Sequence, residues 1–148
     1  METIRQILVV CVGNICRSPM AEAVLRNALG NQEDIAVESA GLGAMVDWPP
    51  AEHAEQLMRE RGLDISGHRA RQLEPELLHA ADLVLVMELG HKKAIEAEDP
   101  TVRGKVFRLG EWQSRDIPDP FQKPKEEFEK VLRQIDSCSA DWVKRLNV

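Results

Sequence analysis

A cysteine and an arginine stand six residues apart where a predicted strand gives way to a predicted helix. Cys11 follows the apolar run of residues 7–10, and Arg17 precedes a helical pattern that begins near Pro19. The backbone N–H groups of a short loop before a helix can turn toward one point, and with the helix dipole they favour an anion. A thiol inside such a loop indicates phosphoryl transfer onto sulfur.

Each residue type in this loop has a physical reason to be there. A helix start and a nearby guanidinium lower the pKa of a cysteine, so Cys11 can attack as a thiolate. Arg17 offers a planar fork for two phosphoryl oxygens. Gly13 permits close approach to the anion, and Asn14 tolerates a left-handed turn. Ser18 can hydrogen-bond the thiolate and later the departing sulfur.

The elements that must position this loop alternate along the chain. Strands followed by helices predict a single α/β domain over residues 1–148 with a parallel, doubly wound sheet, whose site lies at the carboxyl ends of the strands. Ser18 is predicted as the N-cap of the first helix, with Pro19 in its first position. The predicted strands are 4–10, 35–39, 82–87 and 105–109. The predicted helices are 19–29, 51–61, 74–80, 89–98 and a long one from Pro124. This last helix has an apolar stripe formed by Phe128, Val131, Leu132, Ile135, Trp142 and Leu146.

Composition excludes several classes of partner. The formal net charge of −6 argues against nucleic acid or an anionic membrane, since both favour a basic face. The same charge repels anionic substrates, so a local positive site must attract them. No apolar run reaches transmembrane length, and three cysteines without a basic, apolar leader predict a reducing cytoplasm. We expect no membrane insertion and no nucleic-acid partner.

The chain resembles the low-molecular-weight protein tyrosine phosphatases. Residues 9–23 look like the N-terminal signature of that family, and Asp119-Pro120-Phe121 looks like its acid motif. Residues 38–41 and 68–72 fit the family in order and spacing. The resemblance implies a four-stranded parallel sheet flanked by helices on both faces, and hydrolysis of phosphotyrosine through a phosphocysteine with no cofactor and no metal.

The resemblance also implies roles for individual residues. Cys11 would be the nucleophile, Arg17 would clamp the phosphoryl oxygens, and Asp119 would protonate the leaving phenolate and then activate water. The two prolines beside Asp119 stiffen its loop. The phosphate-binding loop would comprise Val12, Gly13, Asn14, Ile15, Cys16 and Ser18, supported from behind by Ser39 and His68.

Two cysteines and three histidines lie outside these roles. Cys16 matches a second cysteine that forms a reversible disulfide with the nucleophile in some members, and a buried residue at a helix start is an equally good interpretation. Cys138 is predicted to be a core residue. His53, His79 and His91 match no motif and are predicted to be surface or helix residues.

The substrate and partner are indicated by finer features. Phe121 can stack on a phenyl ring, and Leu42, in the loop 42–48, is predicted to form another pocket wall. The run 41–44 resembles bacterial members associated with capsule and exopolysaccharide synthesis, which act on the tyrosine-rich tails of membrane-linked tyrosine kinases. We therefore expect a phosphotyrosine protein as substrate, such a kinase as partner, and a monomer. The chain has no tyrosine, so it cannot be regulated by its own tyrosine phosphorylation.

Three alternatives share the same loop. Thioredoxin-coupled arsenate reductases need a further cysteine pair after the third strand, and residues 82–90 contain none. Protein-arginine phosphatases of this scaffold carry a threonine where this chain has Ile15, and an apolar side chain suits a phenyl ring better than a guanidinium. A non-catalytic phosphate-binding module would need neither Cys11 nor Asp119.

Overall fold

Strand β1 (Gln6–Cys11) lies inside the sheet and ends at the candidate nucleophile. The computed structural model describes residues 3–30 and 34–146. β1 pairs in parallel with β2 (Ala36–Gly41) on one side and with β3 (Leu83–Val86) on the other, and β4 (Val106–Arg108) adds to β3. The order β2-β1-β3-β4 confirms the predicted four-stranded parallel sheet.

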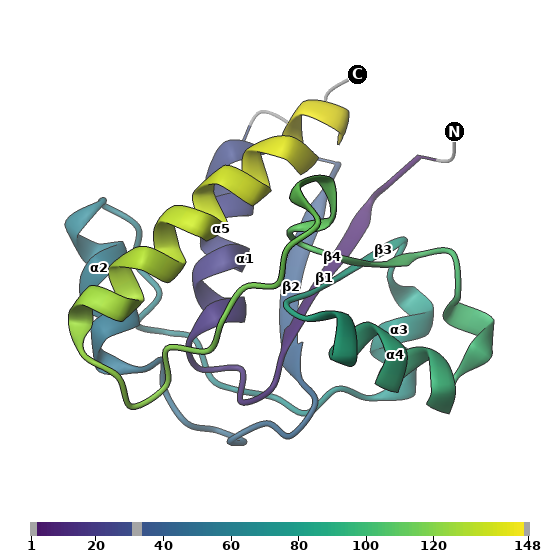
Figure 1. Ribbon diagram of the computed structural model, residues 1–148, viewed down its shortest axis with the longest axis horizontal. Helices are drawn as coiled ribbons and strands as arrows, with labels where there is room; N and C mark the ends of the chain where they lie inside the picture. Colours follow the sequence, from purple (N-terminus) through teal and green to yellow (C-terminus); the bar gives the residue numbers. More distant parts are fainter. Residues whose placement is uncertain (1–2, 31–33, 147–148) are drawn as a thin grey trace.

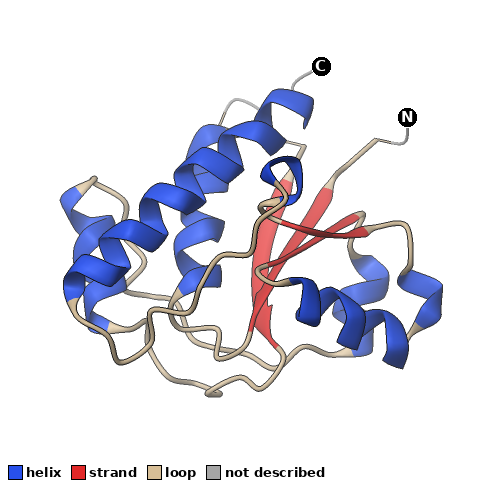
Figure 2. Ribbon diagram, viewed as in Figure 1, coloured by secondary structure: helices blue, strands red, loops and turns tan. Residues whose placement is uncertain are grey.

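Helices cover both faces of this sheet. Figure 2 shows the strands between two groups of helices, and Figure 1 identifies α1, α2 and α5 on one side and α3 and α4 on the other. This arrangement is what parallel strands need, because their crossover connections place helices over both faces. The helices are α1 (Arg17–Ala28), α2 (Glu52–Glu60), α3 (Pro75–Ala80), α4 (Leu89–Glu98) and α5 (Lys125–Leu146), with short 3₁₀ turns η1 (Pro100–Val102) and η2 (Glu111–Gln113).

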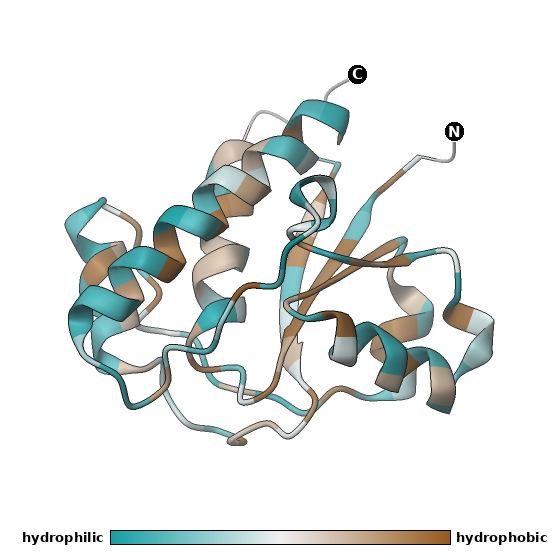
Figure 3. Cartoon of the chain, viewed as in Figure 1, coloured by the Kyte–Doolittle hydropathy of each residue, from teal (hydrophilic) through white to brown (hydrophobic). Residues whose placement is uncertain are grey.

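Successive residues of β1 belong to different halves of the core. Ile7, Val9 and Cys11 pack in the cluster shared with α1, α2 and α5, while Leu8 and Val10 pack in the cluster shared with α3 and α4. This follows from the two-residue period of a strand, whose side chains alternate between faces. Figure 3 accordingly shows apolar strands and helices with polar outer faces. Among the described helices, none has both the length and the apolar character needed to cross a bilayer.

The long C-terminal helix packs as its apolar stripe predicts. The first four positions of the stripe and Trp142 are buried, and Leu146 is partly buried against the same cluster. Trp142 Nε1 also donates to the carbonyl of Leu109 at 2.8 Å, which satisfies the indole inside the core. Cys138 is fully buried in this helix, which confirms its predicted place in the core.

The start of the first helix differs from the prediction. α1 begins at Arg17 with Cys16 in the N-cap position, and no side chain caps it. Ser18 lies within the helix because its hydroxyl is hydrogen-bonded to Cys11 and Asn14 instead of to the helix start. Pro19 is the third helical residue, where its missing N–H still falls among the donors that have no intrahelical partner.

Strand β2 is also displaced from its predicted bounds. It runs to Gly41, two residues beyond the predicted end, because Gly41 pairs with Cys11 of β1. A Cβ on Gly41 would lie 2.4 Å from the carbonyl oxygen of Val12, so only glycine permits this close approach of two backbones. The small residues Ala40 and Gly41 carry little strand signal in the sequence.

Candidate active site

A cavity of about 140 Å³ opens at the carboxyl ends of the strands. Cys11 forms its floor at the end of β1, and Arg17 enters it from the first residue of α1. This is the position at which open α/β sheets bind ligands. The cavity is lined by Cys11, Val12, Gly13, Ile15, Cys16, Arg17, Gly43, Met45, Asp119 and Phe121.

The loop after β1 is held by a hydrogen-bonded network around Asn14, which is fully buried and has a φ of 61°. Its side-chain amide donates to Ser18 Oγ at 2.7 Å and to Ser39 Oγ at 3.0 Å. Its side-chain oxygen accepts from the backbone N–H of Arg71 at 3.0 Å. The positive φ confirms that position 14 needs a residue that tolerates a left-handed turn.

This network directs the hydroxyl proton of Ser18 toward the thiol. Ser18 Oγ already accepts from Asn14, so its own proton is free for Cys11 Sγ, which lies 2.9 Å away. The same reasoning applies to Ser39, which accepts from Asn14 and donates to Glu22 Oε1 at 2.6 Å. Ser18 is therefore placed to hydrogen-bond the sulfur of Cys11.

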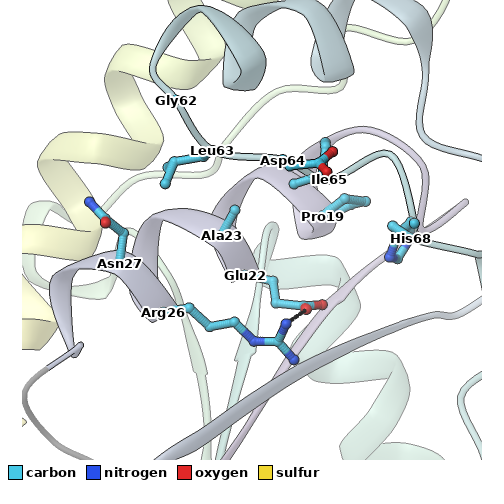
Figure 4. A pocket seen from close by; sticks show the side chains of 11 residues that line it. Pro19, Glu22, Ala23, Arg26, Asn27, Gly62, Leu63, Asp64, Ile65 and His68 are labelled. Atoms are coloured by element: carbon cyan, nitrogen blue, oxygen red, sulfur yellow. Dashed lines mark ion pairs between the residues drawn. The ribbon is translucent and has the colours of Figure 1, made fainter.

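His68 supports the loop from the side opposite the cavity. Its Nε2 lies 2.7 Å from the backbone oxygen of Asn14, which makes Nε2 the protonated nitrogen in that contact. His68 and Glu22 also line a separate groove of about 560 Å³ between α1 and residues 62–68. Figure 4 shows Glu22 in this groove, paired with Arg26 at 3.1 Å. The groove therefore lies directly behind the phosphate loop.

Arg17 is oriented before any ligand arrives. Its side chain is 2% exposed, and one terminal nitrogen donates to Glu88 Oε2 at 2.6 Å and to the carbonyl of Ile117 at 2.8 Å. The other terminal nitrogen lies 3.8 Å from Asp119 Oδ2. Two short contacts on one nitrogen leave the rest of the fork for a ligand in the cavity.

Asp119 faces Arg17 across the cavity from a loop far along the chain. One of its oxygens accepts from the backbone N–H of Phe121 at 3.0 Å, and the other turns toward the guanidinium. The carboxyl is half exposed, so water can reach it. Phe121 stands at the mouth of the cavity, with its ring partly open to solvent.

A model of the family described as low molecular weight phosphotyrosine protein phosphatase matches residues 6–148 of this chain. The chain belongs to this family. A probable low molecular weight protein-tyrosine-phosphatase called EpsP, from Ralstonia solanacearum, is 48% identical, with 97% of each chain covered. The tyrosine phosphatase Wzb from Escherichia coli K30, solved with sulphate, superposes with a TM-score of 0.90 at 37% identity over 97% of this chain and 99% of that one. The YwlE arginine phosphatase from Geobacillus stearothermophilus superposes with a TM-score of 0.89 at 34% identity over 96% of this chain and 92% of its own.

One predicted wall of this phosphatase pocket lies elsewhere. Leu42 does not line the cavity but packs against the core cluster on the α3 and α4 side of the sheet. The segment continues the pairing of β2, with Gly43 and Met45 donating their N–H groups to the loop carbonyls of Val12 and Gly13 at 3.0 Å. The chain turns at residues 42–43, after which Met45 lines the cavity while Leu42 packs on the other side.

Three residues near the phosphatase site were missed in the sequence. Met45 lines the cavity, Glu22 accepts from Ser39, and Glu88 holds Arg17. Glu88 had a usable signal, because it follows a buried strand directly and so lies at the edge where parallel strands end. His91, predicted to be a surface or helix residue, lies in α4 but is only 11% exposed.

The predicted need for glycine at position 13 is not visible in the packing of the loop. A Cβ there would meet its nearest atom, Met45 Sδ, at 3.6 Å, which is an ordinary contact. Gly13 also does not have a positive φ. Any requirement for glycine at this position would come from the approach of an anion.

Cys16 is a buried thiol at the start of α1. Burial raises its pKa to about 12, and the nearby charges of Cys11 and Asp119 act in the same direction. All three cysteines are unpaired in the described part of the chain. At neutral pH Cys16 is thus protonated. The role of Cys16 as a redox partner of Cys11 stays a prediction.

Proposed function

We propose that this phosphatase hydrolyses phosphotyrosine in protein substrates through a phosphocysteine intermediate. The observation that carries the proposal is the meeting of Cys11, Arg17 and Asp119 in one cavity, from two segments far apart in the sequence. A nucleophile, an oxyanion clamp and a proton donor are the groups that phosphoryl transfer to a side chain requires.

In the first step the thiolate of Cys11 attacks phosphorus, and the bond from phosphorus to the tyrosine oxygen breaks as the bond to sulfur forms. Arg17 binds the phosphoryl oxygens with the part of its fork that Glu88 leaves free. Asp119, in its protonated form, gives its proton to the departing phenolate. The support for this step is the position of Asp119 opposite Arg17 and its access to water.

In the second step water attacks the phosphocysteine, and the bond from phosphorus to sulfur breaks. The carboxylate of Asp119 takes a proton from that water, and inorganic phosphate leaves the site. The hydroxyl of Ser18 hydrogen-bonds the departing thiolate and keeps its proton, as its 2.9 Å contact with Cys11 allows. Both catalytic groups then return to their starting protonation states.

The walls of the cavity favour an aryl phosphate. Ile15 is buried in the loop, Met45 stands beside it and Phe121 flanks the mouth, so a flat phenyl ring would meet apolar surface on several sides. A phosphoarginine substrate would place a polar guanidinium against the same apolar side chains, at a cost in unpaired hydrogen-bond donors. We therefore prefer phosphotyrosine over the activity named for the YwlE neighbour.

The partner proposed for this phosphatase is an autophosphorylating bacterial tyrosine kinase that controls exopolysaccharide or capsule synthesis. The support is the resemblance of residues 41–44 to members of that type and the similarity to the Ralstonia protein called EpsP. Free cysteines suit a reducing compartment, so we propose the cytoplasm as the location of the protein. We also propose that it is a monomer.

Turnover of matched phosphopeptides tests the proposal. Release of phosphate should be faster from a phosphotyrosine peptide than from a phosphoarginine peptide, and a chelator should not change the rate. Cys11→Ser should abolish turnover because a serine hydroxyl is a far weaker nucleophile than a thiolate. Cys138→Ser makes the same exchange in the core and should retain the rate of the folded protein. Unchanged turnover in Cys11→Ser would exclude the covalent mechanism, and a preference for phosphoarginine would reverse the substrate assignment.

A further inference from the structure

His91 is a mostly covered imidazole beside the active site that the proposed mechanism does not use. It lies in the first turn of α4, with its side chain 11% exposed. Its Nδ1 is buried without a hydrogen-bond partner among the residues that the structure describes. Its Nε2 lies 3.6 Å from Glu88 Oε2, which is too long for a hydrogen bond. Neither ring nitrogen of His91 therefore makes a hydrogen bond with a described residue.

The charges that face His91 come from three parts of the fold. Burial is the largest cause that lowers its pKa, and Arg17 of α1 acts in the same direction. Glu88, after β3, raises the pKa, as do Asp116 and Asp119 in the loop after η2. The net effect is a pKa below the ordinary histidine value, so His91 is neutral at pH 7 in the empty site.

Two of the other cations around α4 are already paired. Arg108 of β4 contacts Asp116 at 3.2 Å, and Lys92 contacts Glu96 at 2.7 Å along the helix. Asp116 also accepts the backbone N–H of Leu89 at the start of α4. These pairs leave His91 as the group on this side of the cavity that can gain a positive charge.

A bound phosphoryl group changes this balance. Among the described residues that line the cavity, Arg17 is the one cation, and one of its nitrogens is already bound to Glu88. If the site binds phosphoryl groups as proposed above, the ligand brings up to two negative charges beside Asp119 and Glu88. Negative charge that arrives near a titratable imidazole favours its protonated form.

We propose that His91 is a positioning residue that takes up a proton from solvent when a phosphoryl oxyanion binds. When protonated, His91 holds the carboxylate of Glu88 between itself and Arg17, so Glu88 keeps the guanidinium in place. The positive charge of His91 then offsets part of the negative charge of the ligand. Glu88 lies between the two cations: its Oε2 is 2.6 Å from Arg17 and 3.6 Å from His91 Nε2. Binding and proton uptake are then linked, so the affinity for the oxyanion gains most at pH values where His91 is protonated.

Titration of the imidazole resonances by NMR tests the proton uptake directly. The unsubstituted protein is titrated from about pH 5 to about pH 9 with and without saturating inorganic phosphate, and His91→Gln assigns the resonance. The midpoint of His91 should move to higher pH with phosphate. His79, which is exposed and paired with Asp99, is the internal control and should not move. A fixed His91 midpoint, with shifts in the loop amides that show phosphate bound, would overturn the inference but not the proposed function.

Inhibition by inorganic phosphate gives a second test. The ratio of the inhibition constants of His91→Gln and the unsubstituted protein should rise to roughly fivefold or more as the pH falls from about 8 to about 5. The titration of phosphate itself is the same for both proteins and cancels in the ratio. A purely structural role for His91 would give a ratio that does not vary with pH, which would overturn the inference. Failure of phosphate to bind the unsubstituted protein would contradict the proposed function as well.

Discussion

At the scale of single residues, the site depends on side chains whose hydrogen-bonding groups are held in one orientation by their partners. Asn14 uses both amide hydrogens and its oxygen, so the two serines that it contacts must direct their own protons onward, to Cys11 and to Glu22. Asp119 differs from these residues because it is half exposed and the oxygen that faces Arg17 lies 3.8 Å from it, beyond hydrogen-bond distance. A proton donor needs that freedom, since it must release and recover a proton in each cycle.

Substitution of Asp119 tests this assignment. Asp119→Asn keeps the size and the loop contact but removes the proton, so kcat should fall by about 10²–10⁴ while the affinity for inorganic phosphate changes little. Asp47→Asn is the matched control, because it makes the same chemical change at an exposed position. The φ of 68° at this position is one that asparagine tolerates. Steady-state kinetics with an aryl phosphate measure both variants. An unaffected kcat in Asp119→Asn would mean that another group supplies the proton.

At the scale of elements, α1 and α5 supply many of the buried side chains in the core cluster that they share with α2 and β1. α1 starts with Arg17, so the packing that positions α1 also positions the oxyanion clamp. α5 contributes Phe128, Ile135 and Trp142 to this cluster, and these side chains are buried. The phosphate loop is therefore held in place by a helix that follows it and by another at the opposite end of the chain.

Truncation of the α5 stripe should destabilise the protein measurably. Ile135 is fully buried, so Ile135→Ala should lower the free energy of unfolding by about 2–5 kcal/mol through lost burial and the cavity left behind. Arg133→Ala, on the exposed side of the same helix, should change it by less than about 0.5 kcal/mol. Urea unfolding followed by circular dichroism measures both. Equal effects of the two substitutions would contradict the packing described for α5.

At the scale of the whole molecule, the net charge of −6 opposes the local charge of the site. In the proposed mechanism Arg17 attracts the phosphoryl group over a short range, while the overall field repels an acidic peptide that carries it. Most of that field comes from exposed side chains, which salt screens over about 10 Å at 0.1 M. The flanking residues of a substrate should thus affect the rate of encounter more than the chemistry.

Phosphotyrosine peptides of opposite flanking charge test this field. At low ionic strength, kcat/KM should be about threefold or more higher for a peptide with basic flanks than for one with acidic flanks, with similar kcat. The difference should shrink as salt is added. A preference that persists at high salt would indicate specific contacts with the flanks instead of a long-range field.

The sequence by itself determined most of the fold and the chemistry of the loop. Alternating apolar runs and helical patterns led to the four-stranded parallel sheet, and the spacing of Cys11 and Arg17 at a strand-to-helix junction indicated a phosphate cradle. These features are local, because strand and helix periods and the donors of a helix start depend on neighbouring residues. The resemblance to a known family then supplied Asp119.

Only the tertiary structure decided which distant groups complete the cradle. Met45 and His91 carry no local pattern that ties them to Cys11, and the position of Glu88 after a strand does not by itself pair it with Arg17. These residues reach the site because β3 and the segment after β2 end beside β1. The helix start at Arg17 was likewise set by contacts across the fold, since the hydroxyl of Ser18 bonds Cys11 and Asn14 rather than capping the helix. Side chains that meet across a sheet depend on register and direction, which the sequence of one strand does not contain.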